Sequence, residues 1–183
     1  ITRNPNLAEA YISLGWIQFA YEWKLKDSEK SYRKAIQLNP KTAQAHQWLG
    51  INLNSQLQYD EAYKTLKRGL DLAPNHPVLL LNFSNTAVER NKFDEATEAL
   101  NKGFSINPNF KVLWYSLYQI FVMKGDSESD ISELINEIET LGDKNESIYA
   151  PLTHYYRNKD NAKFERYLAE WKADNKTRNR SAF

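Results

Sequence analysis

A 34-residue spacing of prolines is the feature that most constrains what this chain of 183 residues can fold into. Pro40, Pro74 and Pro108 are separated by 34 residues each, and every one follows a short apolar segment. Residues 59–62, with the sequence Tyr-Asp-Glu-Ala, return as Phe-Asp-Glu-Ala at residues 93–96. A fixed period of about 20–50 residues is the signature of a repeat protein, in which each unit packs on the next.

Each repeat is predicted to contain two helices. In the second half of a unit, apolar or small side chains recur at i, i+4, i+7 and i+8, as in Ala62, Leu66, Gly69 and Leu70, which is one face of a helix. Alternation with a period of two is absent, so strands are not expected. Each proline ends a helix, because it lacks an amide donor and disfavours helical geometry in the preceding residue. The predicted helices cover residues 7–22, 26–38, 42–56, 59–72, 76–90, 93–106, 110–124 and 128–141.

The residue types that recur with this period resemble those of the tetratricopeptide repeat (TPR) family. Leu-Gly in the first helix (residues 14–15 and 49–50), Tyr/Phe-Asp-Glu-Ala opening the second helix, and the closing proline carry the resemblance, most strongly over residues 7–108. The family implies an all-α, right-handed superhelical solenoid of antiparallel helix pairs. It also implies a concave groove, lined by the first helix of each pair, that holds a protein or peptide segment.

The repeat pattern becomes weaker toward the C-terminus. Ser127 or Ser129 is predicted to cap the second helix of repeat 4, and Gly142 to end it. Pro151 is tolerable only in the first turn of a following helix. The expected divisions are 1–6, the end of a truncated upstream repeat; 7–40, TPR 1; 41–74, TPR 2; 75–108, TPR 3; 109–142, TPR 4 with a degenerate second helix; 143–173, a degenerate TPR-like pair with a turn at 158–161; and 174–183, a basic tail.

The N-terminal end suggests a surface for self-association. Pro5 lies 35 residues before Pro40 and is interpreted as the closing proline of an upstream repeat. The first helix would then lack its neighbour, and its uncovered apolar side chains could drive end-to-end association. Repeat 1 also has one extra residue, between Gly15 and Ser28.

The TPR resemblance assigns groove positions by register alone. The candidate groove residues are Glu9, Ile12, Trp16, Phe19, Gln44, Gln47, Trp48, Ile51, Asn54, Leu81, Asn82, Asn85, Tyr115 and Gln119. The same register contains Ser13, Val78, Val88, Val112, Ser116 and Val122. This lining is apolar and aromatic with amide groups, which suits an extended or helical peptide.

Trp16 and Trp48 are the strongest candidates for anchors, because interface hot spots favour tryptophan. The alternative is that both pack between helices. The TPR subclass that binds chaperone tails clamps a terminal carboxylate with Lys and Arg on the first helices, alongside two Asn, at five positions in all. Here those positions are Ile12, Trp16, Trp48, Val78 and Asn82, so only one matches and such a clamp is not expected.

Composition excludes several other functions. With 24 basic and 23 acidic side chains, the chain is not the strongly basic type that binds nucleic acid. It has no cysteine and no apolar run of the roughly 20 residues that cross a membrane, so no membrane insertion is expected. Its histidines are isolated, and no nucleophile or phosphate-loop motif occurs. We therefore expect no catalysis, no metal and no cofactor.

A narrower resemblance concerns the whole protein. The segments Asn6–Tyr11, Leu14–Trp16, Tyr21–Trp23 and Tyr32–Pro40 are similar to the C-terminal TPR region of bacterial winged-helix one-component transcriptional regulators, which are anchored by one membrane helix. That resemblance implies a sensor or interaction module and favours a periplasmic location, with a cytoplasmic one otherwise. The alternative is an accessory scaffold of an enzyme or of a secretion, pilus or envelope assembly complex.

Overall fold

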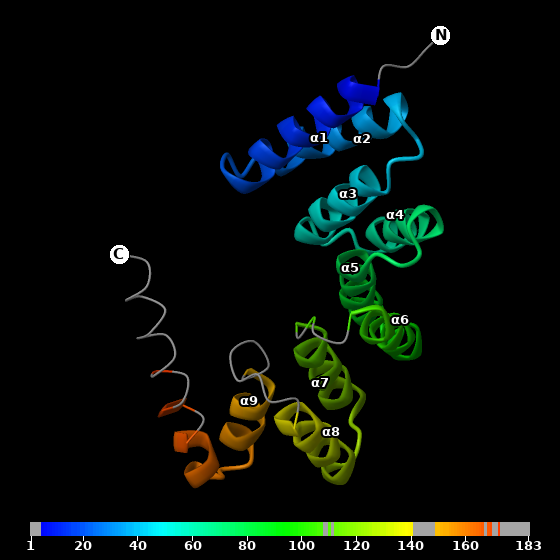
Figure 1. Ribbon diagram of the computed structural model, residues 1–183. Helices are drawn as coiled ribbons and strands as arrows, with labels where there is room; N and C mark the ends of the chain where they lie inside the picture. The colour runs from blue at the N-terminus through cyan, green and yellow to red at the C-terminus, as the bar shows by residue number, and fades with distance from the viewer. Residues whose placement is uncertain are drawn as a thin grey trace. The chain divides into compact units, whose positions relative to one another are not determined.

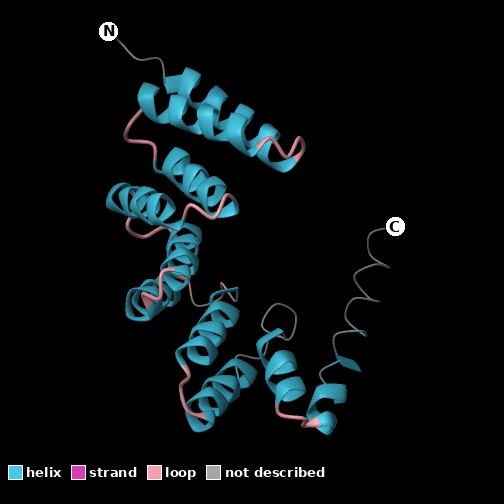
Figure 2. Cartoon of the chain, turned by 180° about the vertical axis from the view of Figure 1, so that it is seen from behind, coloured by secondary structure: helices cyan, strands magenta, loops and turns pink. Residues whose placement is uncertain are grey.

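The computed structural model describes residues 5–107, 110, 112–140, 149–166, 168, 169 and 172. Regular structure in these residues is helical, without strands (Figure 2). The chain divides into two compact units, Ile1–Asn107 and Pro108–Phe183. The all-α class expected from the helical periodicity is confirmed.

The first unit consists of three antiparallel helix pairs (Figure 1). Each helix packs most extensively against its own partner, and neighbouring pairs meet through the contacts of α2 with α3 and of α4 with α5. The first helices of the pairs also contact one another, α1 with α3 and α3 with α5, so they form one side of the unit. The pairs are α1 (Pro5–Ala20) with α2 (Leu25–Leu38), α3 (Ala43–Ser55) with α4 (Tyr59–Leu72), and α5 (Pro77–Glu89) with α6 (Phe93–Ile106).

The helix boundaries agree closely with the prediction. The bounds of α4 and α6 are those expected, and Pro40 and Pro74 lie in the loops between pairs. Pro5 differs, because it is the first residue of α1 instead of lying before it. A proline is tolerated there, since the first amides of a helix have no partner within it.

The glycine of each Leu-Gly motif allows the two helices of a pair to approach closely. A Cβ atom on Gly15 would lie 2.6 Å from Tyr32 Cε1, and one on Gly50 would collide with Leu66 Cγ. Tyr32 and Leu66 are fully buried and occupy equivalent positions 34 residues apart. The motif is therefore a packing requirement between the first and second helix.

The turns within the pairs repeat with the same period. A residue with positive φ occurs at Trp23, Leu57, Asn91, Gly125 and Lys159, which are 34 residues apart throughout. In the last four turns, the amide after this residue donates to the carbonyl five residues earlier. This is the Schellman arrangement that ends many helices. The turn at Lys159 shows that the helix–turn–helix expected near residues 158–161 keeps the register of the array.

The first turn contains the extra residue of repeat 1. Here the Lys24 amide donates to the Gln18 carbonyl, six residues earlier, at 2.9 Å. The insertion therefore widens the end of α1 and leaves Ser28 in register, with its hydroxyl donating to the Gly15 carbonyl at 2.8 Å.

The second unit contains α7 (Val112–Lys124), α8 (Glu128–Thr140), α9 (Tyr149–Arg157) and a helical segment over residues 161–166. The predicted cap of α8 is confirmed at Ser127, whose hydroxyl accepts from the Asp130 amide at 3.2 Å. Pro151 lies in the first turn of α9, as expected. Buried His154 on α9 lies 3.5 Å from a Glu128 carboxylate oxygen, and its ring packs edge-on against Tyr118 of α7.

Some expectations fall outside the described residues. These are the stop of α8 at Gly142 and the basic tail at 174–183. Within the described part of the chain, no helix is long and apolar enough to span a membrane.

Candidate functional site

A hollow between α3 and α5 brings together several predicted groove residues. Its volume is about 380 Å³, and it lies at the N-terminal ends of both helices. Predicted residues Gln44, Gln47, Trp48 and Val78 line it together. The remaining lining residues are Ala43, His76 and Leu79.

Trp48 has two roles in this hollow. One part of its side chain packs against the core cluster that contains Ala45, Leu49 and Leu53. Another part lines the hollow and leaves the residue only half-buried. The two interpretations of Trp48 are therefore not exclusive, since a ring held by the core can still offer a rigid apolar edge to a ligand.

The C-terminal ends of α3 and α5 are held together by side chains. The Asn54 amide donates to Thr86 Oγ1 at 2.5 Å, and the Thr86 hydroxyl donates to the Asn82 carbonyl at 2.8 Å. Asn54 Oδ1 and Asn82 Nδ2 are buried and have no hydrogen-bond partner among the described residues. One acceptor and one donor on predicted groove residues are thus unused, and both atoms are shielded from the surface.

The electrostatics of the hollow arise from the two helix starts. No side chain caps α3 at Thr42, whereas His76 Nδ1 accepts from the Leu79 amide at 3.2 Å at the start of α5. Uncapped amides and the helix dipole favour negative ligand groups, by about 0.3–1 kcal/mol at an exposed site. His46 faces the interior instead: burial lowers its pKa, and its Nε2 lies 3.2 Å from the Pro40 carbonyl.

The other predicted groove residues differ in how accessible they are. Exposed ones are Glu9, Gln44, Asn85 and Gln119, and half-buried ones are Phe19, Ile51, Asn54, Asn82 and Tyr115. Buried ones are Ile12, Gln47 and Leu81. Ile12 belongs to the core cluster with Tyr32 and Leu49, so its side chain serves packing instead of offering a groove surface. Tyr115 and Gln119 lie on α7, in the second unit.

Trp16 is one of the more exposed candidates. Its side chain is 38% exposed, and its ring packs edge-on against Tyr21 with centroids 5.2 Å apart. It does not line the hollow between α3 and α5.

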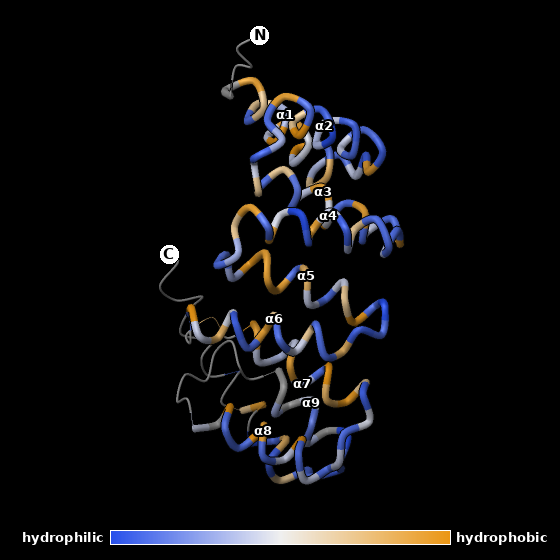
Figure 3. Tube along the Cα trace, turned by 90° about the vertical axis from the view of Figure 1, so that its right-hand side faces the viewer, coloured by the Kyte–Doolittle hydropathy of each residue, from blue (hydrophilic) through white to orange (hydrophobic). Residues whose placement is uncertain are grey.

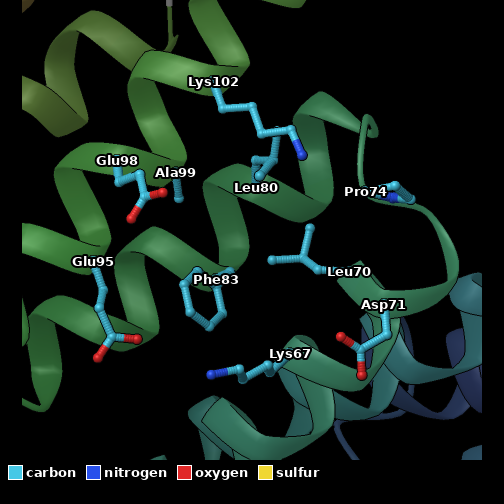
Figure 4. Close-up of a pocket in the computed structure, with 10 residues that line it drawn as sticks. All are labelled: Lys67, Leu70, Asp71, Pro74, Leu80, Phe83, Glu95, Glu98, Ala99 and Lys102. Atoms are coloured by element: carbon cyan, nitrogen blue, oxygen red, sulfur yellow. The ribbon is translucent and has the colours of Figure 1, made fainter.

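A second hollow of about 460 Å³ lies between α4 and α6 over the side of α5 (Figure 4). Leu70, Leu80 and Phe83 form its apolar floor, while charges of both signs, such as Glu98 and Lys102, stand at its walls. Because charges of both signs surround it, this hollow has no preference for an anionic or a cationic ligand. None of its lining residues belongs to the predicted groove.

Sequence reasoning missed three lining residues of the first hollow. Ala43, His76 and Leu79 lie at or near the helix starts, outside the groove register. The signal that could have identified His76 is its position directly before Pro77, which marks it as the cap of α5.

Comparison with known proteins agrees with this architecture. Residues 53–119 match the family model described as a tetratricopeptide repeat. No curated protein matches the chain in sequence. Solved structures match it with high similarity of fold, at sequence identities that are too low to carry more than the fold.

Three such structures are informative. PilF of Pseudomonas aeruginosa matches with a TM-score of 0.71 and 20% identity over 93% of this chain and 77% of its own. MamA matches with a TM-score of 0.64 and 21% identity over 73% of this chain and 77% of its own. The first TPR of Spaghetti (RPAP3), bound to the HSP90 peptide SRMEEVD, matches with a TM-score of 0.65 and 13% identity over 69% of this chain and 99% of its own.

The fold is that of a tetratricopeptide-repeat array. The sequence match supports the repeat over residues 53–119, and the structures support the fold over most of the chain. The array is of the kind that serves protein interaction. The narrower resemblance to winged-helix regulators is not addressed by these comparisons and stays a prediction.

Proposed function

We propose that this array binds a peptide or an extended protein segment along α3 and α5, with Trp48 as the apolar anchor. The observation that carries the proposal is that Gln44, Gln47 and Trp48, assigned to the groove by register, line one hollow. The unused acceptor of Asn54 and donor of Asn82 lie on the same two helices, and both side chains would have to turn outward to pair with the ligand backbone. The Spaghetti (RPAP3) domain, solved with a bound HSP90 peptide, is a precedent for peptide binding by this fold.

The test is peptide-array binding by the wild-type chain and two variants. Trp48→Ala removes the anchor, and we expect binding to fall at least about tenfold, because a tryptophan that acts as an interface hot spot is worth about 2 kcal/mol or more. Trp23→Ala is the matched control, since Trp23 is 80% exposed and does not line the hollow. Equal binding by both variants would remove Trp48 as anchor.

Trp48 also packs on the core, so a second variant separates binding from folding. Gln44 is exposed and lines the hollow, and Gln44→Ala is expected to weaken binding without changing the thermal midpoint. Retained binding in Gln44→Ala, with lost stability in Trp48→Ala, would contradict the proposal.

We infer that the array is the sensor or interaction part of a larger bacterial, membrane-anchored transcriptional regulator. The support is the resemblance of residues 6–49, including the aromatic turn at Tyr21 and Trp23, to the TPR regions of such regulators. The coding sequence before Ile1 tests this inference. A winged-helix domain followed by a membrane helix would support it, whereas a catalytic domain or a lipoprotein signal would favour an accessory scaffold.

A further inference from the structure

Gln47 on α3 is a buried polar side chain that has no hydrogen-bond partner. It is 9% exposed, and its amide makes no hydrogen bond to the described residues. Because it lines the hollow between α3 and α5, its donor and its acceptor are available to that space. A buried amide that stays unpaired costs free energy, so a glutamine at this position indicates a ligand that pairs with it.

The first turn of α3 places further donors beside this amide. No side chain caps the helix at Thr42, so the amides of residues 43–45 have no acceptor within the helix. Helical side chains point back toward the N-terminus, so the Gln47 side chain lies over this turn. Ala43 and Gln44 line the same hollow as Gln47. Backbone and side-chain donors therefore meet at one end of the hollow.

His76 adds a donor from the start of α5. Its Nδ1 accepts from the Leu79 amide at 3.2 Å, so in the neutral ring the proton is on Nε2. His76 is exposed and lines the hollow. The lining contains no Asp or Glu that could pair with these donors or repel an anion.

The rest of the hollow is apolar. Trp48 is half-buried, Val78 is 39% exposed and Leu79 is buried, and all three line the hollow. The apolar run at residues 78–81 gives α5 a hydrophobic stretch near its start (Figure 3). A ligand that fills this space therefore needs an apolar group next to a group that accepts hydrogen bonds.

We propose that the start of α3 is a subsite for a carboxylate of the bound peptide, with an apolar ligand side chain beside it on Trp48 and Val78. The subsite presupposes the proposed function, because it lies in the same hollow. The carboxylate accepts from the first-turn amides of α3 and from the Gln47 side chain, with His76 as a further donor. A phosphate fits less well, because the lining has no Lys or Arg to neutralise its second negative charge. For the same reason the subsite differs from the clamp of the chaperone-binding subclass.

The experiment measures binding of the chain to an array of short peptides made in matched pairs. The members of a pair differ either by Glu or Gln at one internal position, or by a free or amidated C-terminus. We expect the carboxylate member to bind about tenfold more tightly, because an ionised acceptor makes the stronger hydrogen bonds. A preference for the internal Glu assigns an acidic side chain to the subsite, and a preference for the free terminus assigns the terminal carboxylate.

Thr42→Asp connects this preference to the start of α3. The new side chain supplies a carboxylate from the chain itself, because Asp is a favoured N-cap residue that accepts from the same amides. We expect the preference to disappear while the thermal midpoint stays equal or rises. Gln58→Asp is the matched control, because it changes the charge equally at the uncapped start of α4, outside the hollow.

Gln47→Met tests the side-chain donor, since it removes the amide and nearly keeps the volume. We expect it to reduce the preference for the carboxylate about threefold or more. Gln37→Met, at an exposed residue of α2 that does not line the hollow, is its control. Thermal melts of both variants check that the fold is kept.

Three results would overturn the carboxylate subsite. The first is equal binding of both members of every pair, which would leave the proposed function standing if peptides still bind. The second is a preference that survives in Thr42→Asp, and the third is a preference that is lost equally in Gln58→Asp. A chain that binds no peptide of either form would contradict the proposed function and the subsite together.

Discussion

Helices α1 and α3 are the same element in consecutive repeats, yet they bury different faces. Both carry a Leu-Gly motif, and both glycines lie under a side chain of the partner helix. The leucine of the motif is exposed in α1 and buried in α3, because within the described residues a preceding helix pair packs against α3 and none packs against α1. In a repeat array, therefore, a residue at a given repeat position is buried only where a neighbouring unit packs against it.

The largest expected effect separates the two leucines. Leu49→Ala leaves a cavity between α2, α3 and α4, and we expect it to lower the free energy of unfolding by about 3 kcal/mol. Leu14→Ala removes an exposed side chain and should change it by no more than about 0.5 kcal/mol. Urea denaturation at low protein concentration, where self-association is absent, measures both. Equal losses would mean that α1 is covered in solution.

The glycines give the next largest effect. Gly50→Ala forces a Cβ into Leu66 Cγ, which is fully buried, and we expect a loss of about 2–3 kcal/mol. Gly15→Ala meets the Tyr32 ring, but α1 can shift outward toward its open face, so its loss should be nearer 1 kcal/mol. Thermal melts of both variants provide the comparison. A larger loss for Gly15→Ala would show that the open face gives α1 no freedom to move.

Alkaline pH should weaken the packing of the first pair around Tyr32. Burial raises the pKa of Tyr32 to about 12, from an ordinary value near 10. The unfolded chain ionises first, so stability is complete below pH 10 and falls as the pH rises toward 12. Relative to Tyr32→Phe, the wild-type chain should lose about 2 kcal/mol over this range. Denaturation curves at pH 9 and pH 11.5 test this, and a difference that does not depend on pH would contradict it.

The smallest effect concerns the turns. Leu57 and Trp23 both have positive φ, of 60° and 55°. A left-handed backbone costs a non-glycine residue about 1 kcal/mol, part of which glycine returns through its greater freedom when unfolded. We therefore expect Leu57→Gly and Trp23→Gly each to stabilise the chain by about 0.5 kcal/mol in thermal melts. A gain confined to Leu57→Gly would show that the inserted residue of the first turn has relieved the strain at Trp23.

Much of the fold could be predicted because the repeat supplies several independent signals. The prolines, the columns of small residues and the helical period agreed on the bounds of α4 and α6. The sequence placed the extra residue only between Gly15 and Ser28. A repeat that is one residue longer shows that a residue was added, but it does not show where between these two positions it was added. Its position at the end of α1 depends on the hydrogen bond from Lys24 to Gln18, which is a property of the folded turn.

The candidate site was less predictable. Register alone placed Ile12 in the groove, but its side chain is drawn into the core beside Tyr32. The hollow beside Trp48 depends on how far apart α3 and α5 lie at their N-terminal ends. The bond between Asn54 and Thr86 ties only the other ends together. Distances between helices of different repeats are not encoded in the periodicity of either helix.

Four of the turn residues with positive φ also define where this molecule could be cut and rejoined. Because the turns at Leu57, Asn91, Gly125 and Lys159 share a positive φ and the same amide-to-carbonyl hydrogen bond at equal spacing, a segment running from one of them to the next begins and ends in a similar turn. Such a segment is an interchangeable cassette, made of the second helix of one pair and the first helix of the next. Duplicating or deleting the cassette between Leu57 and Asn91 would lengthen or shorten the array while every joint kept its shape.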